Sequence, residues 1–202
     1  MKTENLYIVW AHPRPDSLTA SVVKEMHNQA ISQGINVTMF DLYRNNFHPV
    51  LAVEDEPDWS SPTKEYSPEV HQLYAELEAN DTIMMVFPVW WFSFPAIMKG
   101  YLDRVWNHGL AYGAGSSLKG KKFRYVALVG STQNTYVKYG WEKNITDYII
   151  GMMSYLEVDD TKIDFLYNTL GLEDDVNEKH YQQLFSQARG IVEELNNQSL
   201  NK

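Results

Sequence analysis

The sequence predicts a doubly wound α/β fold, in which helices cover both faces of a parallel β-sheet. Five apolar runs of strand length alternate along the chain with segments of helix length. Parallel strands need such crossovers, because the chain must return to the same edge of the sheet before each new strand. The third run, residues 82–87, is apolar throughout, as expected of a strand buried on both faces. Without repeat or linker, residues 1–202 are expected to form one domain.

The first half of the chain is predicted to contain two strands and two helices. A strand at residues 6–11 is followed by Pro13 and Pro15, which exclude strand and helix alike. Asp16 or Ser17 offers an N-cap to a helix that ends near Gly34, and a strand follows at residues 35–40. Residues 41–61 are interpreted as a long loop. Its acidic stretch, 54–58, either shapes a substrate rim or merely solvates the loop, and the second interpretation is preferred. The triplet 67–69 (Ser-Pro-Glu) predicts the start of the second helix.

The second half continues the alternation. Strands are predicted at 82–87, 125–130 and 163–167, and helices at 96–106, 141–156 and 180–195. The basic cluster made by residues 119–122 and Arg124 has two interpretations, a contact with a cofactor phosphate or a solvated turn before the fourth strand, of which the turn is preferred.

Composition excludes several classes of function. A formal charge of -9 disfavours nucleic acid and anionic membrane surfaces as partners. With no cysteine, the chain has no thiol chemistry of its own. The six histidines lack the spacing of a metal site, so no metal is expected. We find neither a secretory signal nor an apolar run of membrane-spanning length, which predicts a cytoplasmic protein without membrane insertion.

In an open parallel sheet, ligands bind beyond the carboxyl ends of the strands, where the direction of the connections changes. This rule predicts that the ligand binds at the loops formed by residues 12–17, 88–95 and 131–140. The first leads into a helix N-terminus, whose free amides favour an anion, and Ser17 and Thr19 add hydroxyl groups. A phosphate would fit there, although a plain N-cap explains the same residues.

The loop after the third strand is rich in aromatic rings. Its sequence, residues 87–95, reads Phe-Pro-Val-Trp-Trp-Phe-Ser-Phe-Pro. Exposed rings at a ligand-binding edge call for a flat partner, and an isoalloxazine could stack there. A hydrophobic plug or a subunit interface is the alternative. A phosphate site beside an aromatic surface favours a flavin nucleotide.

These residues resemble those of the NAD(P)H:quinone oxidoreductases of the flavodoxin-like superfamily, also called the DT-diaphorase-like family. The resemblance covers nearly the whole chain and is carried by residues 8–13, 16–19, 87–96, 99–105 and 109–113. Within the family, bacterial members of the YcaK type are the most similar. The resemblance implies a flavodoxin-like three-layer α/β/α fold with a five-stranded parallel sheet in the order 2-1-3-4-5.

The resemblance also implies a function. NAD(P)H would reduce a non-covalently bound flavin, leave, and be replaced by a quinone or a similar small acceptor. FAD is expected, with FMN as the alternative, and an adenylate would need a groove near the 41–61 loop. A homodimer is expected as well. Carried over by position, the cofactor-binding residues are His12, Ser17, Leu18, Thr19, Pro88, Val89, Trp90, Trp91, Phe92, Gly130, Ser131 and Thr132.

One candidate catalytic residue follows from the fourth-strand loop. Tyr136 could donate a hydrogen bond to the reduced flavin or to the substrate, or it could be a partly buried loop aromatic. Many relatives carry a Gly-Gly pair and a histidine in this loop, whereas this chain has no such pair and places Glu142 near the histidine position. Two other functions therefore stay open, a flavodoxin-like electron carrier and a non-catalytic or weakly active flavin-binding regulatory partner.

Overall fold

The computed structural model describes residues 2–61, 63–113, 118–171 and 178–197. Its centre is a five-stranded parallel sheet in the order β2-β1-β3-β4-β5, which confirms the predicted topology. The strands are β1 (Asn5–Trp10), β2 (Asn36–Asp41), β3 (Thr82–Pro88), β4 (Lys122–Leu128) and β5 (Asp160–Leu166).

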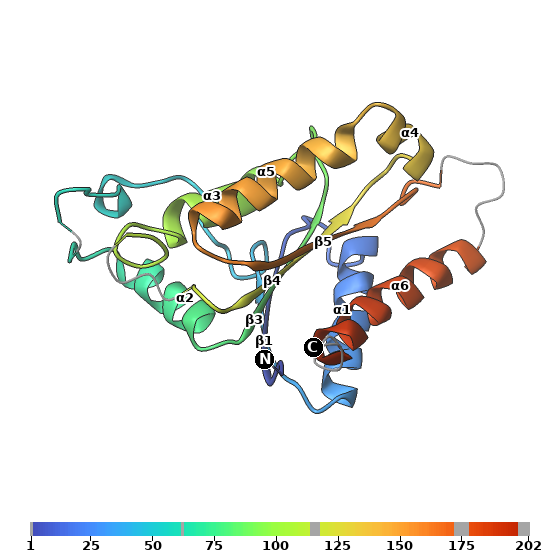
Figure 1. Cartoon of the computed structure of the whole chain (residues 1–202), viewed down its shortest axis with the longest axis horizontal. Helices are drawn as coiled ribbons and strands as arrows, with labels where there is room; N and C mark the ends of the chain where they lie inside the picture. The colour runs from blue at the N-terminus through green and yellow to red at the C-terminus, as the bar shows by residue number, and fades with distance from the viewer. Residues whose placement is uncertain (1, 62, 114–117, 172–177, 198–202) are drawn as a thin grey trace.

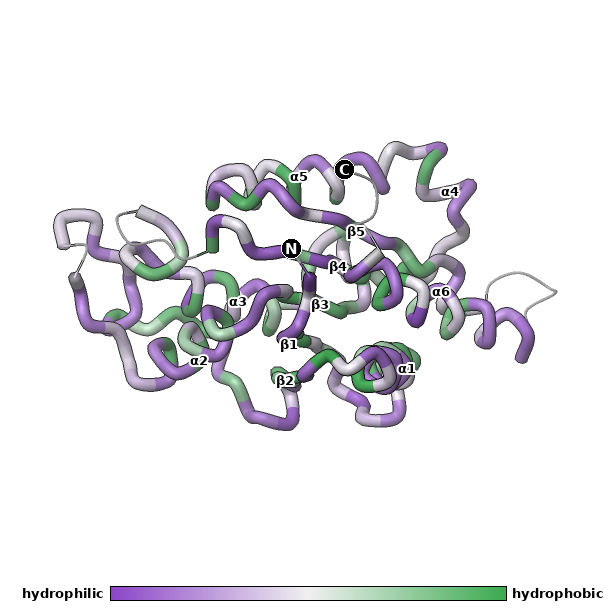
Figure 2. Tube along the Cα trace, turned by 60° about the horizontal axis from the view of Figure 1, so that its bottom comes forward, coloured by the Kyte–Doolittle hydropathy of each residue, from purple (hydrophilic) through white to green (hydrophobic). Residues whose placement is uncertain are grey.

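Helices cover both faces of the sheet (Figure 1). Helices α1 (Leu18–Ser32) and α6 (Glu178–Asn197) pack on one face, and α2 (Pro68–Glu78), α3 (Ala96–Val105) and α5 (Trp141–Tyr155) pack on the other. Figure 2 shows that α1, α5 and α6 alternate between hydrophobic and hydrophilic stretches, as helices with one buried stripe must.

The strands divide their side chains between two apolar cores. In β1, Tyr7 and Val9 pack toward α2, α3 and α5, whereas Leu6 and Ile8 pack toward α1 and α6. This two-residue period follows from the pleat of the strand. The strands β1, β3 and β4 lie inside the sheet and are almost wholly buried, whereas the edge strands β2 and β5 are more exposed. The carboxyl ends of the inner strands are therefore held in a rigid, buried layer.

Two predicted helix caps are present. The Ser17 hydroxyl accepts a hydrogen bond from the Ala20 amide at 3.1 Å, and α1 starts one residue later. The Ser67 hydroxyl accepts from the Val70 amide at 3.4 Å, and Pro68 occupies the first turn of α2. Each serine satisfies an amide that has no carbonyl partner within its helix.

The preferred interpretation of the basic cluster was wrong for two of its residues. Strand β4 begins at Lys122, and both Lys122 and Arg124 are buried in it. The Lys122 ammonium donates to the Leu195 carbonyl oxygen at 2.9 Å, and the Arg124 guanidinium pairs with the Asp160 carboxylate at 2.8 Å. Long cationic side chains can lie inside a sheet when their charged ends find such partners.

The acidic stretch at residues 54–58 was also misjudged, because it does more than solvate a loop. Asp55 lies in a 3-10 turn, η1 (Val53–Asp55), and is fully buried. Its carboxylate pairs with the Arg104 guanidinium of α3 at 2.9 Å and accepts a hydrogen bond from the Ser67 amide at 2.8 Å. The long loop is thereby fastened to α2 and α3.

The predicted loop at residues 131–140 contains a short helix, α4 (Gln133–Lys138), capped by Thr132. Its six residues are too few to give a readable helical period in the sequence. Among the described residues, no helix combines the length and the hydropathy that crossing a membrane requires.

Candidate functional site

The loops that follow β1, β3, β4 and β5 come together at the carboxyl edge of the sheet. Backbone hydrogen bonds join the last two of these loops: the Asn168 amide donates to the Ser131 carbonyl at 2.8 Å, and the Thr169 amide donates to the Val129 carbonyl at 3.0 Å. The Val89 amide donates to the Leu128 carbonyl at 2.8 Å and so extends the pairing of β3 and β4. The edge therefore presents a continuous, hydrogen-bonded rim.

A cavity of about 190 Å³ lies between the loop after β1 and the rim. It brings together seven predicted residues, namely His12, Leu18, Thr19, Pro88, Val89, Trp90 and Gly130. The first amides of α1 have no carbonyl partner inside the helix, and the helix dipole adds a partial positive charge at this end. The cavity therefore has the chemistry of an anion site.

His12 is held in a defined orientation at this cavity. Its Nδ1 atom accepts a hydrogen bond from the Arg14 amide at 3.1 Å, and its ring packs edge-on against Trp90 with centroids 6.0 Å apart. Burial lowers the pKa of His12, which favours the neutral imidazole. Because Nδ1 is an acceptor, the neutral ring carries its proton on Nε2 and can donate there.

The loop after β3 makes a tight turn with strained aromatic residues. Trp90 and Ser93 exchange backbone hydrogen bonds at 3.2 and 3.1 Å, leaving Trp91 and Phe92 as the two turn residues. Both have positive φ, 49° and 58°, a conformation that disfavours side chains with a Cβ. The Trp91 side chain is 94% exposed. A strained turn that displays a large apolar ring to solvent points to a binding role.

A second cavity, of about 310 Å³, lies beneath this turn. The predicted residues that line it are Val89, Trp91, Phe92, Gly130, Ser131 and Tyr136. Val89 and Gly130 also line the first cavity, so the two adjoin. A cavity with the chemistry of an anion site and an aromatic cavity thus lie side by side.

Tyr136 lies at the base of the aromatic cavity. It is 4% exposed, and its ring packs against Trp141 with centroids 5.5 Å apart. Burial raises the pKa of Tyr136, so its hydroxyl stays protonated at neutral pH and can donate a hydrogen bond.

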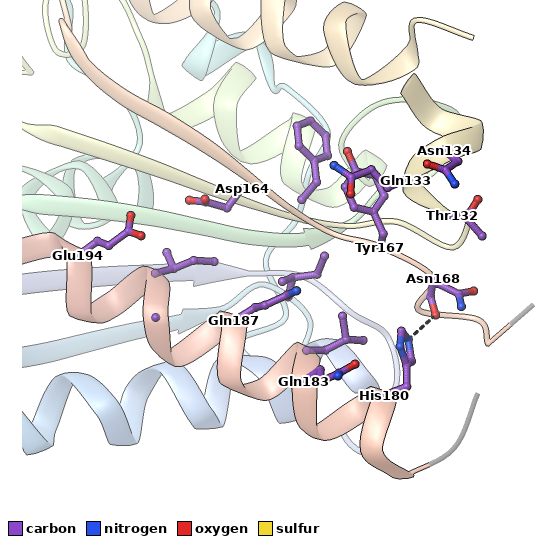
Figure 3. Close-up of a pocket in the computed structure, with 15 residues that line it drawn as sticks. Thr132, Gln133, Asn134, Asp164, Tyr167, Asn168, His180, Gln183, Gln187 and Glu194 are labelled. Carbon is purple, nitrogen blue, oxygen red and sulfur yellow. Dashed lines mark hydrogen bonds between the residues drawn. The ribbon is translucent and has the colours of Figure 1, made fainter. Parts of the chain in front are cut away.

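Ser17 and Thr132 line neither of these two cavities. Ser17 is buried and caps α1, and Thr132 caps α4. Thr132 does line a third and larger cavity, of about 690 Å³, between β5 and α6 (Figure 3). Amide side chains are prominent in its wall, among them Gln183 and Gln187 from α6. His180, at the start of α6, approaches the Asn168 carbonyl oxygen at 3.1 Å.

The Glu142 carboxylate is hydrogen-bonded to Tyr167. The Tyr167 hydroxyl donates a hydrogen bond to the Glu142 carboxylate, and burial together with this carboxylate raises the pKa of Tyr167. Glu142 lines neither of the two adjoining cavities, whereas its neighbour Trp141 lines the aromatic one. The carboxylate is thus held by a phenol donor.

Sequence reasoning missed six residues of the two cavities: Arg14, Leu128, Val129, Trp141, Thr169 and Leu170. Arg14 lies within the predicted ligand-binding loop at residues 12–17 but was not predicted as a site residue. Trp141 follows the fourth-strand loop directly. Thr169 and Leu170 follow β5, which the switch-point rule did not nominate, and Asn168 with its positive φ of 56° turns the chain toward the site. Among the described residues, no three acidic or histidine side chains group as metal ligands do.

Comparison with known proteins gives the same class of fold. Residues 4–189 match the family model described as "Flavodoxin-like fold". The uncharacterized NAD(P)H oxidoreductase YcaK of Escherichia coli K12 is 53% identical over 196 residues, which cover 96% of this chain and 100% of that protein. The chain therefore belongs to the flavodoxin-like family, in the NAD(P)H oxidoreductase branch that its sequence resembles, and it is an enzyme.

Two solved structures with lower sequence identity have the same fold. The NAD(P)H:quinone oxidoreductase of Methanothermobacter marburgensis superposes with a TM-score of 0.86 at 22% identity, covering 96% of this chain and 97% of that one. The FMN-dependent NADH-azoreductase of Bacillus anthracis, solved in complex with FMN, superposes with a TM-score of 0.72 at 16% identity, covering 95% and 99%.

Proposed function

We propose that this enzyme binds a flavin nucleotide at the two adjoining cavities and passes reducing equivalents from NAD(P)H to a quinone or a similar small acceptor. The observation that carries the proposal is the juxtaposition of an anion site at the start of α1 with exposed aromatic rings at the turn after β3. A flavin nucleotide joins a phosphate to a flat ring system, the two groups that these cavities suit.

The residues present fit such a group. Gly130 lines both cavities, and a Cβ there would come within 2.7 Å of the Leu170 Cδ1 atom, so only glycine leaves this space free. The amides of α1 suit the phosphate, and the Trp91 and Phe92 rings suit the isoalloxazine.

When bound, a flavin supplies hydride acceptance and electron transfer to a second substrate. The chain would supply position and electrostatics. His12 would donate from Nε2 toward the phosphate or ribityl part. Tyr136 would hold its proton on the phenol oxygen and donate it as a hydrogen bond to the reduced cofactor or the substrate. The Trp91 and Phe92 rings would exclude water from one face of the site.

FMN is better supported than the FAD that we expected. The azoreductase relative is named FMN-dependent, whereas residues 41–61, where an adenylate groove was expected, line neither of the two cavities. The cavity between β5 and α6 offers FAD a different space (Figure 3). Binding titrations with both flavins decide the matter: Gln183→Leu combined with Gln187→Leu should weaken FAD selectively if its adenylate enters this cavity.

A homodimer completes the proposal. Helix α5 exposes Tyr148, Ile150 and Tyr155, and loops expose Trp59 and Trp91. A second copy would remove these apolar side chains from water. Sedimentation of the purified chain tests this proposal, and cell fractionation tests the cytoplasmic location.

The first experiment is an absorbance spectrum of protein incubated with FMN or FAD and then desalted. A retained band at about 450 nm that anaerobic NADPH bleaches supports the oxidoreductase. Oxidation of the reduced form by menadione supports a quinone-type acceptor. If the flavin is retained but NAD(P)H does not reduce it, the result favours the electron carrier or the regulatory partner. If neither flavin is retained, the site proposal fails.

A further inference from the structure

Arg44 reaches from the end of β2 into the loop that follows β1. Its Nη1 atom donates to the Pro13 carbonyl at 2.9 Å, and its Nη2 atom donates to the His12 carbonyl. The guanidinium therefore holds two consecutive carbonyl groups of the loop that lines the anion site.

Arg44 is itself fixed by its surroundings. The Asp41 carboxylate accepts from Arg44 Nε at 2.6 Å, and its other oxygen accepts from the Tyr43 and Arg44 amides at 3.0 and 3.1 Å. The guanidinium also lies over the Trp10 ring, 5.0 Å from its centroid. A planar cation with five donors can satisfy all these partners together, which a lysine ammonium cannot.

The loop depends on such an outside anchor. Pro13 and Pro15 have no N–H group, so they cannot donate hydrogen bonds that would close the loop on itself. The two carbonyls that Arg44 binds would otherwise be free to turn toward the anion site, where their partial negative charge would oppose a phosphate. Arg44 holds them toward β2 and adds a positive charge beside the loop.

We propose that Arg44 is the positioning residue that shapes the loop after β1 for a nucleotide phosphate. The inference rests on the proposed flavin site, but it concerns a residue that lines neither flavin cavity. Arg44 would act through the loop backbone, and its effect should be specific to ligands that carry a phosphate.

The test compares FMN with riboflavin, which lacks the phosphate. We expect Arg44→Gln to weaken FMN binding about ten-fold, as expected for loss of charge-assisted hydrogen bonds, while riboflavin affinity changes less than about two-fold. Arg44→Lys, which keeps the charge but not the fork, should recover only part of the FMN affinity. Arg189→Gln removes a similar cation, paired with Glu25 on α1, and serves as the matched control that leaves both affinities unchanged.

Thermal melting of each variant without flavin verifies folding. Equal loss of FMN and riboflavin affinity in Arg44→Gln, or no loss of either, would overturn the inference. If the wild-type chain binds neither flavin, the proposed function has failed instead. The wild-type titration thus separates the two failures.

Discussion

Arg104 of α3 and Asp55 of the long loop form an ion pair in which the carboxylate is fully buried. The Arg104 guanidinium also donates to the His48 carbonyl at 2.6 Å and pairs with Glu69 at 2.8 Å. The Asn107 side-chain amide donates to the Asp55 carbonyl oxygen at 2.6 Å. Loop, α2 and α3 thus share one polar network inside an otherwise apolar layer.

Asp55→Asn should reduce the free energy of unfolding by about 3–5 kcal/mol, because it removes the buried counter-charge of Arg104 and leaves only the half-exposed Glu69 carboxylate. Urea denaturation at pH 7 measures this. Asp103→Asn on the same helix is the matched control, since it breaks the solvent-exposed pair with Lys99. That variant should change stability little. Equal effects of the two substitutions would contradict the role of the Asp55 pair.

The same pair predicts a response to acid. Burial alone would raise the pKa of Asp55, but hydrogen bonds from Ser67 and Arg104 outweigh it, and the pKa lies below its usual value. The stabilisation is therefore present above the unfolded pKa, about 4, and is lost as pH falls through the folded value. Wild-type stability should drop below about pH 4, and the drop should be smaller in Asp55→Asn. Parallel curves for the two proteins would contradict this.

Gly130→Ala should weaken flavin binding about ten-fold, because the added methyl group would occupy space at a residue that lines both cavities. Folding should change little, because the Leu170 side chain beside it is exposed and can shift. Flavin titration and thermal melting measure the two effects. Gly151→Ala in α5, where a Cβ meets nothing within 4 Å, is the control. It should raise stability by about 0.5–1 kcal/mol and leave flavin affinity unchanged.

Trp91→Gly should stabilise the flavin-free protein by about 1 kcal/mol, because glycine accepts the positive φ of 49° without strain and the exposed indole packs little. The same substitution should weaken isoalloxazine binding. Chemical denaturation and flavin titration test the two parts separately. A destabilised variant would mean that the indole packs more than its exposure indicates.

Tyr136→Phe should retain flavin, because the ring still packs against Trp141. Without the hydroxyl, NADPH-dependent reduction should slow about ten-fold, the value of one lost hydrogen bond in the transition state. Stopped-flow absorbance measures this rate. Because the pKa of Tyr136 is raised, the wild-type rate should show no break from this group between pH 7 and 9. An unchanged rate would make Tyr136 a packing residue.

The alternation of strands and helices and the aromatic loop were predictable, because apolar runs, caps and prolines act over a few neighbouring residues, whereas the sheet order followed from the family resemblance. The buried ion pair was not, since Asp55 and Arg104 lie far apart in the sequence and each resembles a surface residue in its local context. Lys122 and Arg124 were wrongly predicted to lie in a solvated turn for the same reason. In the site, Thr169 and Leu170 were missed because only backbone pairing with Val129 and Ser131 brings the segment after β5 to the cavity.

The residues that line the candidate site lie between positions 12 and 170 of the sequence. They come together only after four parallel strands have paired in register. No local hairpin can form it, so it should appear late in folding, after the non-local contacts are closed. A ligand that binds there binds only the finished sheet, and mass action then raises the stability of the whole molecule. The amount of flavin-bound protein recovered from a refolding mixture would thus measure the number of native molecules directly. The supply of flavin during expression should likewise set the fraction of chains that stay folded.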